Sequence, residues 1–209
     1  MPSGDDHLHE KLRRVLLSPE DALTLEVRGA VNAAVLVPLY LDRGRLHAVF
    51  TKRQHDLRRH PGEISFPGGR YDEGEPDLRA TALREANEEI GLPGDAVDIV
   101  GALQPTATIV TGYAVYPFVG LIEAGRTWTP SAGEVAEVLE LPLDKLLAGY
   151  ARRRLLRRGV PIRTDTYVVG DHLIWGATAR ILADLFDRIG PLLNSGGSSR
   201  PVSPSRSGR

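Results

Sequence analysis

The feature that most constrains the fold is the order in which strand-like and helix-like segments follow one another. Residues 31–41, VNAAVLVPLYL, form an apolar run typical of a buried strand, and the turn at residues 42–44 joins it to a second strand at 46–52. Because the later segments lack a regular βαβ alternation, we expect an α+β fold with a mixed β-sheet sandwiched between α-helices. The other expected strands lie at 97–103, 113–122, 134–141 and, as a weaker pair, near 166–175, and the expected helices lie at 5–18, 77–90, 143–150 and 176–189.

The chain of 209 residues is long enough for one domain with a sizeable core. We expect an N-terminal helix and lead-in at 1–29, the main domain at 30–192 and a tail at 193–209. The end of the chain, NSGGSSRPVSPSRSGR, is rich in serine, glycine and arginine and has no acidic residue. Because it has little apolar surface to bury, we expect this tail to be disordered.

Composition excludes several classes of function. The chain has 26 Lys and Arg against 27 Asp and Glu, so no global charge attracts nucleic acid or an anionic membrane, and a nucleic-acid partner is not expected. Cysteine is absent, which excludes disulfide scaffolds, thiolate metal sites and cysteine nucleophiles. The polar, acidic N-terminus is unlike a secretory signal, and no apolar run approaches the roughly 20 residues that span a bilayer. We expect a cytoplasmic protein, either monomer or homodimer, with no membrane partner.

An acidic helix raises the question of function. The segment REANEEIGL places Glu85, Glu88 and Glu89 on one face of the expected helix 77–90, where like charges repel one another. Pro76 suits the first turn of this helix, and the adjacent glycines Gly68-Gly69 precede it. One interpretation is a solvated helix face, and the other is a site for Mg²⁺ or Mn²⁺, which prefer oxygen ligands and bridge carboxylates to phosphates.

These residues resemble the signature of the Nudix hydrolases, G-x5-E-x7-R-E-U-x-E-E-x-G-U, in which U is apolar. Residues 84–92 match its second half at every defined position. Gly69 and Glu75 keep the first spacing, but eight residues rather than seven separate Glu75 from Arg84, so Asp77 competes with Glu75 for the place of the first glutamate. The resemblance implies a Nudix fold and metal-dependent hydrolysis of nucleoside diphosphates linked to another group.

An upstream segment, FTKRQHDLRRHPGEISFPGG at residues 50–69, resembles the motif of the coenzyme A pyrophosphatase branch of this family. Gln54 departs from that motif, which has a small Ser or Ala at this position, and residues 172–182 resemble the end of the same branch. The resemblance implies cleavage of coenzyme A or acyl-coenzyme A to 3′-phosphoadenosine 5′-phosphate and 4′-phosphopantetheine. The positions in register with the motif are Thr51, Arg53, Arg58, Gly62, Phe66, Pro67, Gly68 and Gly69.

The resemblance also implies roles for individual residues. Glu85, Glu88 and Glu89, with the backbone carbonyl of Gly69, are the expected metal ligands, and Arg84 is expected to orient the glutamates. Glu85 and Glu134 are both candidates for the base that takes a proton from water, and Glu137 is a rival of Glu134. Candidate substrate-binding residues are Arg53, Arg58, His60 and Gly68.

Two further features have alternative interpretations. The arginines in YARRRLLRRG, residues 150–159, suit a 3′-phosphate or nucleic acid, but a solvated helix end with a basic C-terminus is the favoured interpretation. Tyr113, Tyr116 and Trp175 are candidates for stacking on adenine, although packing in or near the core is favoured for each.

Three functions compete. The first is the metal-dependent coenzyme A pyrophosphatase, with coenzyme A or a related nucleotide as its small-molecule substrate. The second is a Nudix hydrolase for another dinucleotide such as ADP-ribose or NADH. The third is a non-catalytic nucleotide- or RNA-binding module, against which the intact E-x-x-E-E pattern argues.

Overall fold

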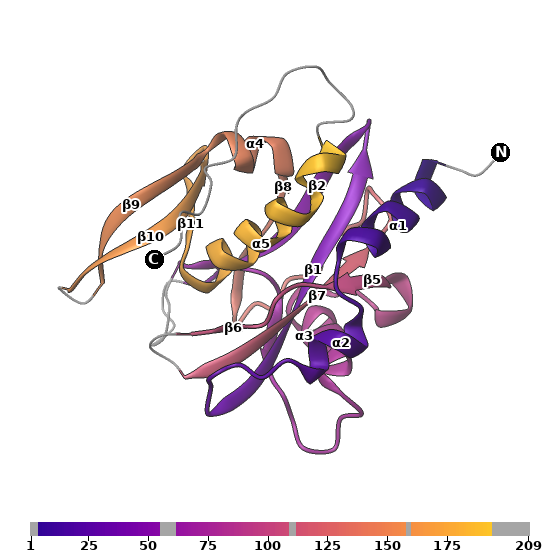
Figure 1. The fold of residues 1–209 in the computed structure, drawn as a ribbon, viewed down its shortest axis with the longest axis horizontal. Coiled ribbons are helices and arrows are strands. Elements are labelled where there is room, and N and C mark those ends of the chain that lie inside the picture. Colours follow the sequence, from indigo (N-terminus) through magenta and orange to yellow (C-terminus); the bar gives the residue numbers. More distant parts are fainter. Residues whose placement is uncertain (1–3, 55–61, 109–111, 158–159, 194–209) are drawn as a thin grey trace.

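The computed structural model describes residues 4–54, 62–108, 112–157 and 160–193 (Figure 1). The helices are α1 (Gly4–Val15), α2 (Pro19–Thr24), α3 (Leu78–Ile90), the 3₁₀ turn η1 (Gly94–Ala96), α4 (Leu143–Ala148) and α5 (Gly176–Leu193). The strands are β1 (Val31–Asp42), β2 (Arg45–Arg53), β3 (Ile64–Ser65), β4 (Gly68–Arg70), β5 (Asp98–Ala102), β6 (Thr106–Ala107), β7 (Tyr113–Leu121), β8 (Val135–Pro142), β9 (Tyr150–Arg157), β10 (Val160–Val169) and β11 (His172–Trp175).

The main sheet is mixed, which confirms the α+β fold expected from the sequence. Its central path runs β3-β2-β1-β7-β5, with β4 paired to β1, β6 to β7 and β8 to β2. β1 and β7 are parallel, whereas the other pairs in this sheet are antiparallel. The predicted hairpin of the first two strands is confirmed, with Asp42 facing Arg45 across its turn.

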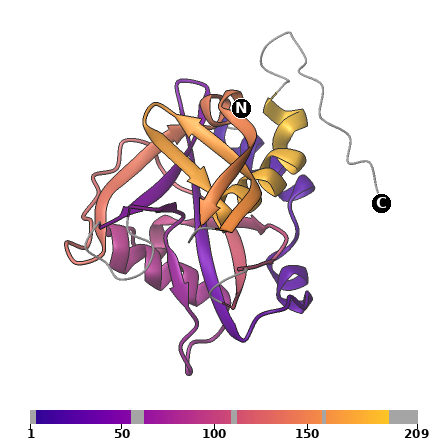
Figure 2. The ribbon, with the colours of Figure 1, turned by 90° about the vertical axis from the view of Figure 1, so that its left-hand side faces the viewer.

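Helices cover both faces of this sheet, and each face has its own hydrophobic core (Figure 2). On one face, α3 and α2 pack against β1 and β7, with Ala86, Ile90 and Phe118 fully buried. On the other face, α1, α4 and α5 enclose a larger cluster that includes Leu12 and Leu182. The apolar spacing of these helices places one face of each against the sheet.

The N-terminal segment is part of this packing. Leu12 at 0% and Leu16 at 8% exposure belong to the core shared with α5, and the guanidinium of Arg188 donates to the carbonyl of Val15 at 3.4 Å. The predicted helix 5–18 corresponds to α1, which ends at Val15. A second short helix that the sequence did not predict, α2, follows it, and Ser18 caps α2 by accepting a hydrogen bond from the Asp21 backbone N–H.

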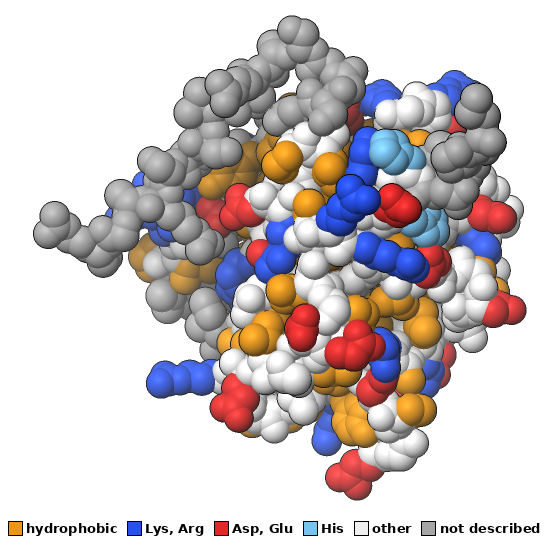
Figure 3. All heavy atoms as spheres, turned by 45° about the vertical axis from the view of Figure 1, so that its right-hand side comes forward, with side chains coloured by type: hydrophobic (Ala, Val, Ile, Leu, Met, Phe, Trp, Pro, Cys, Tyr) orange, Lys and Arg blue, Asp and Glu red, His pale blue; other side chains and the backbone are white. Residues whose placement is uncertain are grey.

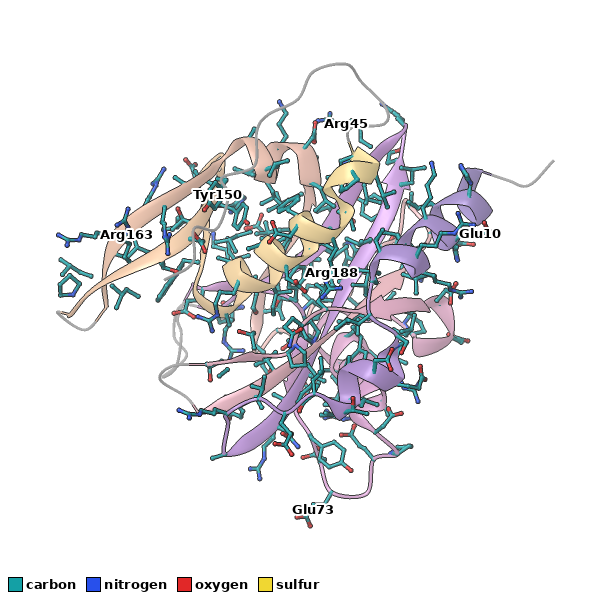
Figure 4. All side chains as sticks on the ribbon, in the orientation of Figure 1. Glu10, Arg45, Glu73, Tyr150, Arg163 and Arg188 are labelled. Carbon is teal, nitrogen blue, oxygen red and sulfur yellow. The ribbon has the colours of Figure 1, made fainter. Side chains whose placement is uncertain are left out.

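The arginine-rich segment corrects a sequence prediction. It is the strand β9 rather than a helix end, because α4 ends at Ala148 and the chain turns at Gly149 into a three-stranded antiparallel sheet, β11-β10-β9. The β9–β10 hairpin projects from the body of the molecule, with Tyr150 near its base and Arg163 farther out (Figure 4). The run Arg152-Arg153-Arg154 followed by Leu155-Leu156 lacks the alternation typical of a strand, so the sequence alone did not indicate β9.

The charged surface agrees with the balanced composition. Basic and acidic side chains are interspersed on the face shown in Figure 3. In the part of the chain that the structure describes, no helix is long and apolar enough to cross a membrane.

Candidate active site

The acidic helix α3 has both of its ends capped. Asp77 is the N-cap, and its carboxylate accepts hydrogen bonds from the backbone N–H groups of Arg79 and Ala80 at 2.8 and 3.0 Å. Pro76 therefore precedes the cap instead of lying in the first turn. Gly91 ends the helix with φ of 69°, a left-handed conformation that favours glycine. The buried stripe of α3 faces β1 and leaves the glutamates along its edge.

The two glycines before the helix allow a close approach of strand β4. Gly69 pairs with Ala34 of β1, and a Cβ atom on Gly69 would collide with the carboxylate of Glu85. A Cβ atom on Gly68 would collide with the carbonyl oxygen of Ala34. Gly68 has no room for a side chain against the backbone of β1, whereas at Gly69 the space is filled by the flexible end of Glu85, a predicted metal ligand.

Arg84 is the centre of the acidic network. Its Nε donates to Glu75 at 2.8 Å, and its Nη1 lies 2.9 Å from Glu85 Oε1 and 3.0 Å from Glu88 Oε2. The hydrogen bond to Glu75 is the main cause that raises the pKa of Arg84, so the guanidinium stays charged. Arg84 therefore contacts Glu75, Glu85 and Glu88 together, and its role of orienting the metal ligands stays a prediction.

Glu75 and Asp77, the two candidates for the first glutamate of the signature, differ in their contacts. Glu75 accepts from Arg84, from the Thr81 hydroxyl at 2.6 Å and from the Asp72 backbone N–H at 3.0 Å. Burial opposes ionisation of Glu75, but these hydrogen bonds outweigh it and lower its pKa. Asp77 is occupied by its capping bonds and by Arg79. Glu75, one residue out of register in the signature, is therefore the residue joined to the glutamate network.

Glu89 is the most buried of the three helix glutamates, with 5% exposure. The Gly68 backbone N–H bonds its carboxylate, while its Oε2 atom is buried and has no hydrogen-bond partner. Burial, reinforced by the charge of Glu85, raises the pKa of Glu89 to about 8, against the opposing charge of Arg53. A buried carboxylate oxygen without a partner is costly, and a cation would compensate it.

Glu85 and Glu88 occupy different environments. The Glu85 side chain is 16% exposed, and burial raises its pKa although Arg84 opposes that shift. The Glu88 side chain is 58% exposed and is directed to Arg84. Among the described residues, no three carboxylate or imidazole side chains are gathered closely enough to hold a metal ion as they stand. Glu85 and Glu89 thus form the inner pair, with Glu88 outside it.

Glu134 comes from the loop between β7 and β8, which runs along the C-terminal end of α3. The Thr129 and Ser131 backbone N–H groups donate to the carbonyls of Ile90 and Glu89 at 3.0 and 2.9 Å. The charge of Glu134 contributes to the raised pKa of both Glu85 and Glu89. Its rival Glu137 instead pairs with Lys52 at 3.7 Å.

The predicted substrate-binding residues divide into two groups. Arg53, at the end of β2, acts electrostatically on Glu89, and its Nε is buried without a hydrogen-bond partner. Gly68 directs its backbone N–H to Glu89. Arg58 and His60 lie outside the described residues. Of the three candidate stacking aromatics, Tyr116 is 8% exposed and donates its hydroxyl to the carbonyl of Leu25, which agrees with the packing interpretation.

Two contributors to the site escaped sequence analysis. Thr81 bonds Glu75, and its spacing of three residues before Arg84 on one helix face could have identified it. Gln54 contacts the turn that carries Glu134, although the sequence showed it only as a departure from a motif.

The arrangement fits a divalent cation. The partnerless oxygen of Glu89 and the glycine cradle beside Glu85 offer hard oxygen ligands in a partly dehydrated setting, which suits Mg²⁺ or Mn²⁺. Glu85 and Glu89 are the residues that would hold the ion.

Comparisons with known proteins define the class. The family model described as NUDIX domain matches residues 31–158, more than half of the chain. The chain therefore belongs to the Nudix family.

Two similar sequences and one similar structure illustrate this relationship. An uncharacterized Nudix hydrolase NudL of Enterobacter sp. (strain 638) is 38% identical over 193 residues, covering 91% of this chain and 98% of the relative. The protein of the same name from Salmonella newport (strain SL254) is 38% identical over 184 residues, covering 87% and 94%. A MutT/nudix family protein of Enterococcus faecalis has a similar fold, with a TM-score of 0.51 and 15% identity over 91% of this chain and 76% of that one.

Proposed function

We propose that this protein is a metal-dependent pyrophosphatase that cleaves coenzyme A or acyl-coenzyme A to 3′-phosphoadenosine 5′-phosphate and 4′-phosphopantetheine or its acyl form. The observation that carries the proposal is that residues of the upstream segment 50–69 and of the acidic helix α3 lie at the same site. Arg53 of the upstream segment, which resembles the coenzyme A branch, acts on Glu89 of the acidic helix. Family membership supports the hydrolase class, and the upstream segment supports the substrate.

The chain's own residues supply most of the proposed mechanism. Glu85 and Glu89 would hold the cation, and Arg84 keeps Glu85 in place through its 2.9 Å contact. Mg²⁺ or Mn²⁺, when bound, neutralises phosphate charge and lowers the pKa of water. Glu134 takes the proton of the attacking water, since it is exposed at the rim and close enough to act electrostatically on both ligands. As the water oxygen bonds to one phosphorus, the bridging P–O bond breaks, and Arg53 binds the departing phosphate and neutralises its developing negative charge.

A second enzymatic candidate is hydrolysis of another dinucleotide, such as ADP-ribose or NADH. Gln54 favours it, because this residue departs from the coenzyme A motif at a position beside Arg53. A binding module without catalysis is the third candidate, and the exposed arginines of β9 favour it.

Product analysis with purified protein tests these candidates. The substrates are coenzyme A, acetyl-coenzyme A, ADP-ribose, NADH, a diadenosine polyphosphate and an oxidised nucleoside triphosphate, each in Mg²⁺ and in Mn²⁺, with Glu89→Gln as the control. Preferred release of 3′-phosphoadenosine 5′-phosphate supports the proposal. Preferred cleavage of another substrate keeps the chemistry and rejects the substrate, and metal-independent, salt-sensitive RNA binding without turnover favours the module.

A further inference from the structure

The turn that carries Glu134 is held in place by a residue on the neighbouring strand. The β2–β8 ladder shifts register where Lys52 faces Glu137 but Arg53 faces Val135, which leaves Ala136 as an extra residue on β8. Such a bulge bends the strand and redirects the residues beside it. Beyond the bulge, the Gln54 backbone N–H donates to the carbonyl of Glu134 at 2.9 Å.

The side chain of Gln54 strengthens this attachment. Its Nε2 donates to the carbonyl oxygens of Ala132 at 3.3 Å and Val135 at 3.4 Å. Together with its backbone N–H, one residue therefore holds three carbonyls at and around Glu134. A primary amide has two N–H donors, whereas a serine hydroxyl has one on a shorter side chain, so serine cannot make the same pair of contacts.

The turn itself is closed from the other side. The carbonyl of Ser131 accepts from the backbone N–H groups of Glu134 at 3.1 Å and Val135 at 2.9 Å, and the Ser131 N–H donates to the carbonyl of Glu89. The turn is thus supported by α3 at one end and by Gln54 of the β2 end at the other. Glu134 lies between these supports, with an exposed side chain that the turn alone does not orient.

We infer that Gln54 is a positioning residue that holds the Glu134 turn in register with the acidic helix and so sets the geometry of proton transfer. The inference rests on the proposed function, in which Glu134 accepts the proton of water. Gln54 touches neither cation ligand nor phosphate in this role. Misplacement of a catalytic group by about 1 Å can lower a rate by about 100-fold, so a loosened turn affects turnover more than binding.

The test is a double-mutant cycle with two readouts. The variants are Gln54→Ser, Glu134→Ala and the pair, with Gln104→Ser as the matched control because the exposed Gln104 uses its backbone N–H for Asp184. We expect Gln54→Ser to lower kcat about 10-fold with little change in KM. In the Glu134→Ala background, the same substitution should change kcat less than about 2-fold, because the group that it positions is gone.

Amide hydrogen exchange gives a readout that is independent of activity. Gln54→Ser should speed exchange of the Glu134 and Val135 amides in the turn, whereas Gln104→Ser should leave it unchanged. An equal loss of kcat in both backgrounds, or unchanged exchange in the turn, would overturn the inference. Wild-type protein without turnover would overturn the proposed function and the catalytic part of this role, while exchange would still show whether Gln54 holds the turn.

Discussion

At the residue scale, Glu89 has an unfavourable electrostatic environment. Its folded pKa of about 8 lies above the ordinary value of 4.5, so the folded state binds this proton more tightly than the unfolded state. The metal-free protein therefore loses stability as pH rises from about 4.5 to about 8. Below pH 4.5 the residue is protonated in both states and the loss is absent.

Glu89→Gln removes both the cation ligand and this pH dependence. We expect metal-dependent turnover to fall at least about 100-fold, while the metal-free fold becomes more stable by roughly 1–4 kcal/mol above pH 8 and is little changed at pH 4.5. Thermal unfolding in a chelator across this pH range, paired with turnover assays, measures both effects. Near-normal turnover in saturating Mg²⁺ would contradict the assigned role.

Gly69→Ala tests the cradle beside Glu85. The added Cβ atom meets the end of a flexible side chain, so Glu85 should move at a stability cost of about 1 kcal/mol or less, while turnover falls about 100-fold. Gly94→Ala is the matched control, because a Cβ there makes only ordinary contacts of 3.7 Å with Leu83. Equal turnover in the two variants would show that the close approach at Gly69 has no catalytic purpose.

At the element scale, the two acidic residues at the start of α3 have different expected roles: Asp77 stabilises the helix, and Glu75 supports the active site. Asp77→Ala removes an N-cap and should cost about 1 kcal/mol of stability while leaving kcat within a few-fold. Glu75→Gln weakens the grip on Arg84 and should lower kcat about 10-fold. Unfolding temperatures and kcat of both variants provide the measurement. The opposite pattern, with kcat sensitive to Asp77 alone, would assign the signature position to Asp77.

The accuracy of the secondary structure predicted from the sequence also differs between elements. Apolar runs predicted β1, β2 and β7 to within one or two residues, because buried strands need continuous apolar surface. The acidic helix was predicted from the proline at its start, Pro76. The strand β9 was assigned wrongly, since its cross-strand partners in β10 and not its own residues decide the conformation.

In the candidate site, too, contacts within one helix could be predicted from the sequence, whereas contacts between distant segments could not. The proximity of Arg84 to Glu85 and Glu88 follows from their positions on one helix. The contact of Arg84 with Glu75, which distinguishes Glu75 from Asp77, depends on the fold of the loop before the helix. The contact of Gln54 with the Glu134 turn joins residues 80 positions apart across a bulge, and no local pattern encodes it.

At the scale of the whole molecule, the N-terminal lead-in belongs to the core. Leu12→Ala should destabilise the protein by about 2–5 kcal/mol, because this side chain is 0% exposed in the cluster with α5. Leu156→Ala is the matched control, with a side chain 79% exposed on the projecting hairpin and an expected change within about 0.5 kcal/mol. Chemical denaturation of both variants gives the comparison.

Equal stabilities of Leu12→Ala and Leu156→Ala would mean that the rest of the domain is stable without the packing of α1. With the expected difference, a chain trimmed to begin at residue 30 would lose a large part of the 5–15 kcal/mol that stabilises a typical domain.

The attachment of the β7–β8 loop to α3 has a consequence for its tolerance of length changes. Residues 129–134 are tied to the carbonyls of Ile90 and Glu89, so an insertion there would separate Glu134 from the helix. Residues 123–125 are exposed, and nothing lies within 4 Å of a Cβ atom built on Gly125. This tip therefore accommodates tags, labels or natural insertions. In the same loop, residues 129–134 tolerate no change of length, whereas residues 123–125 do.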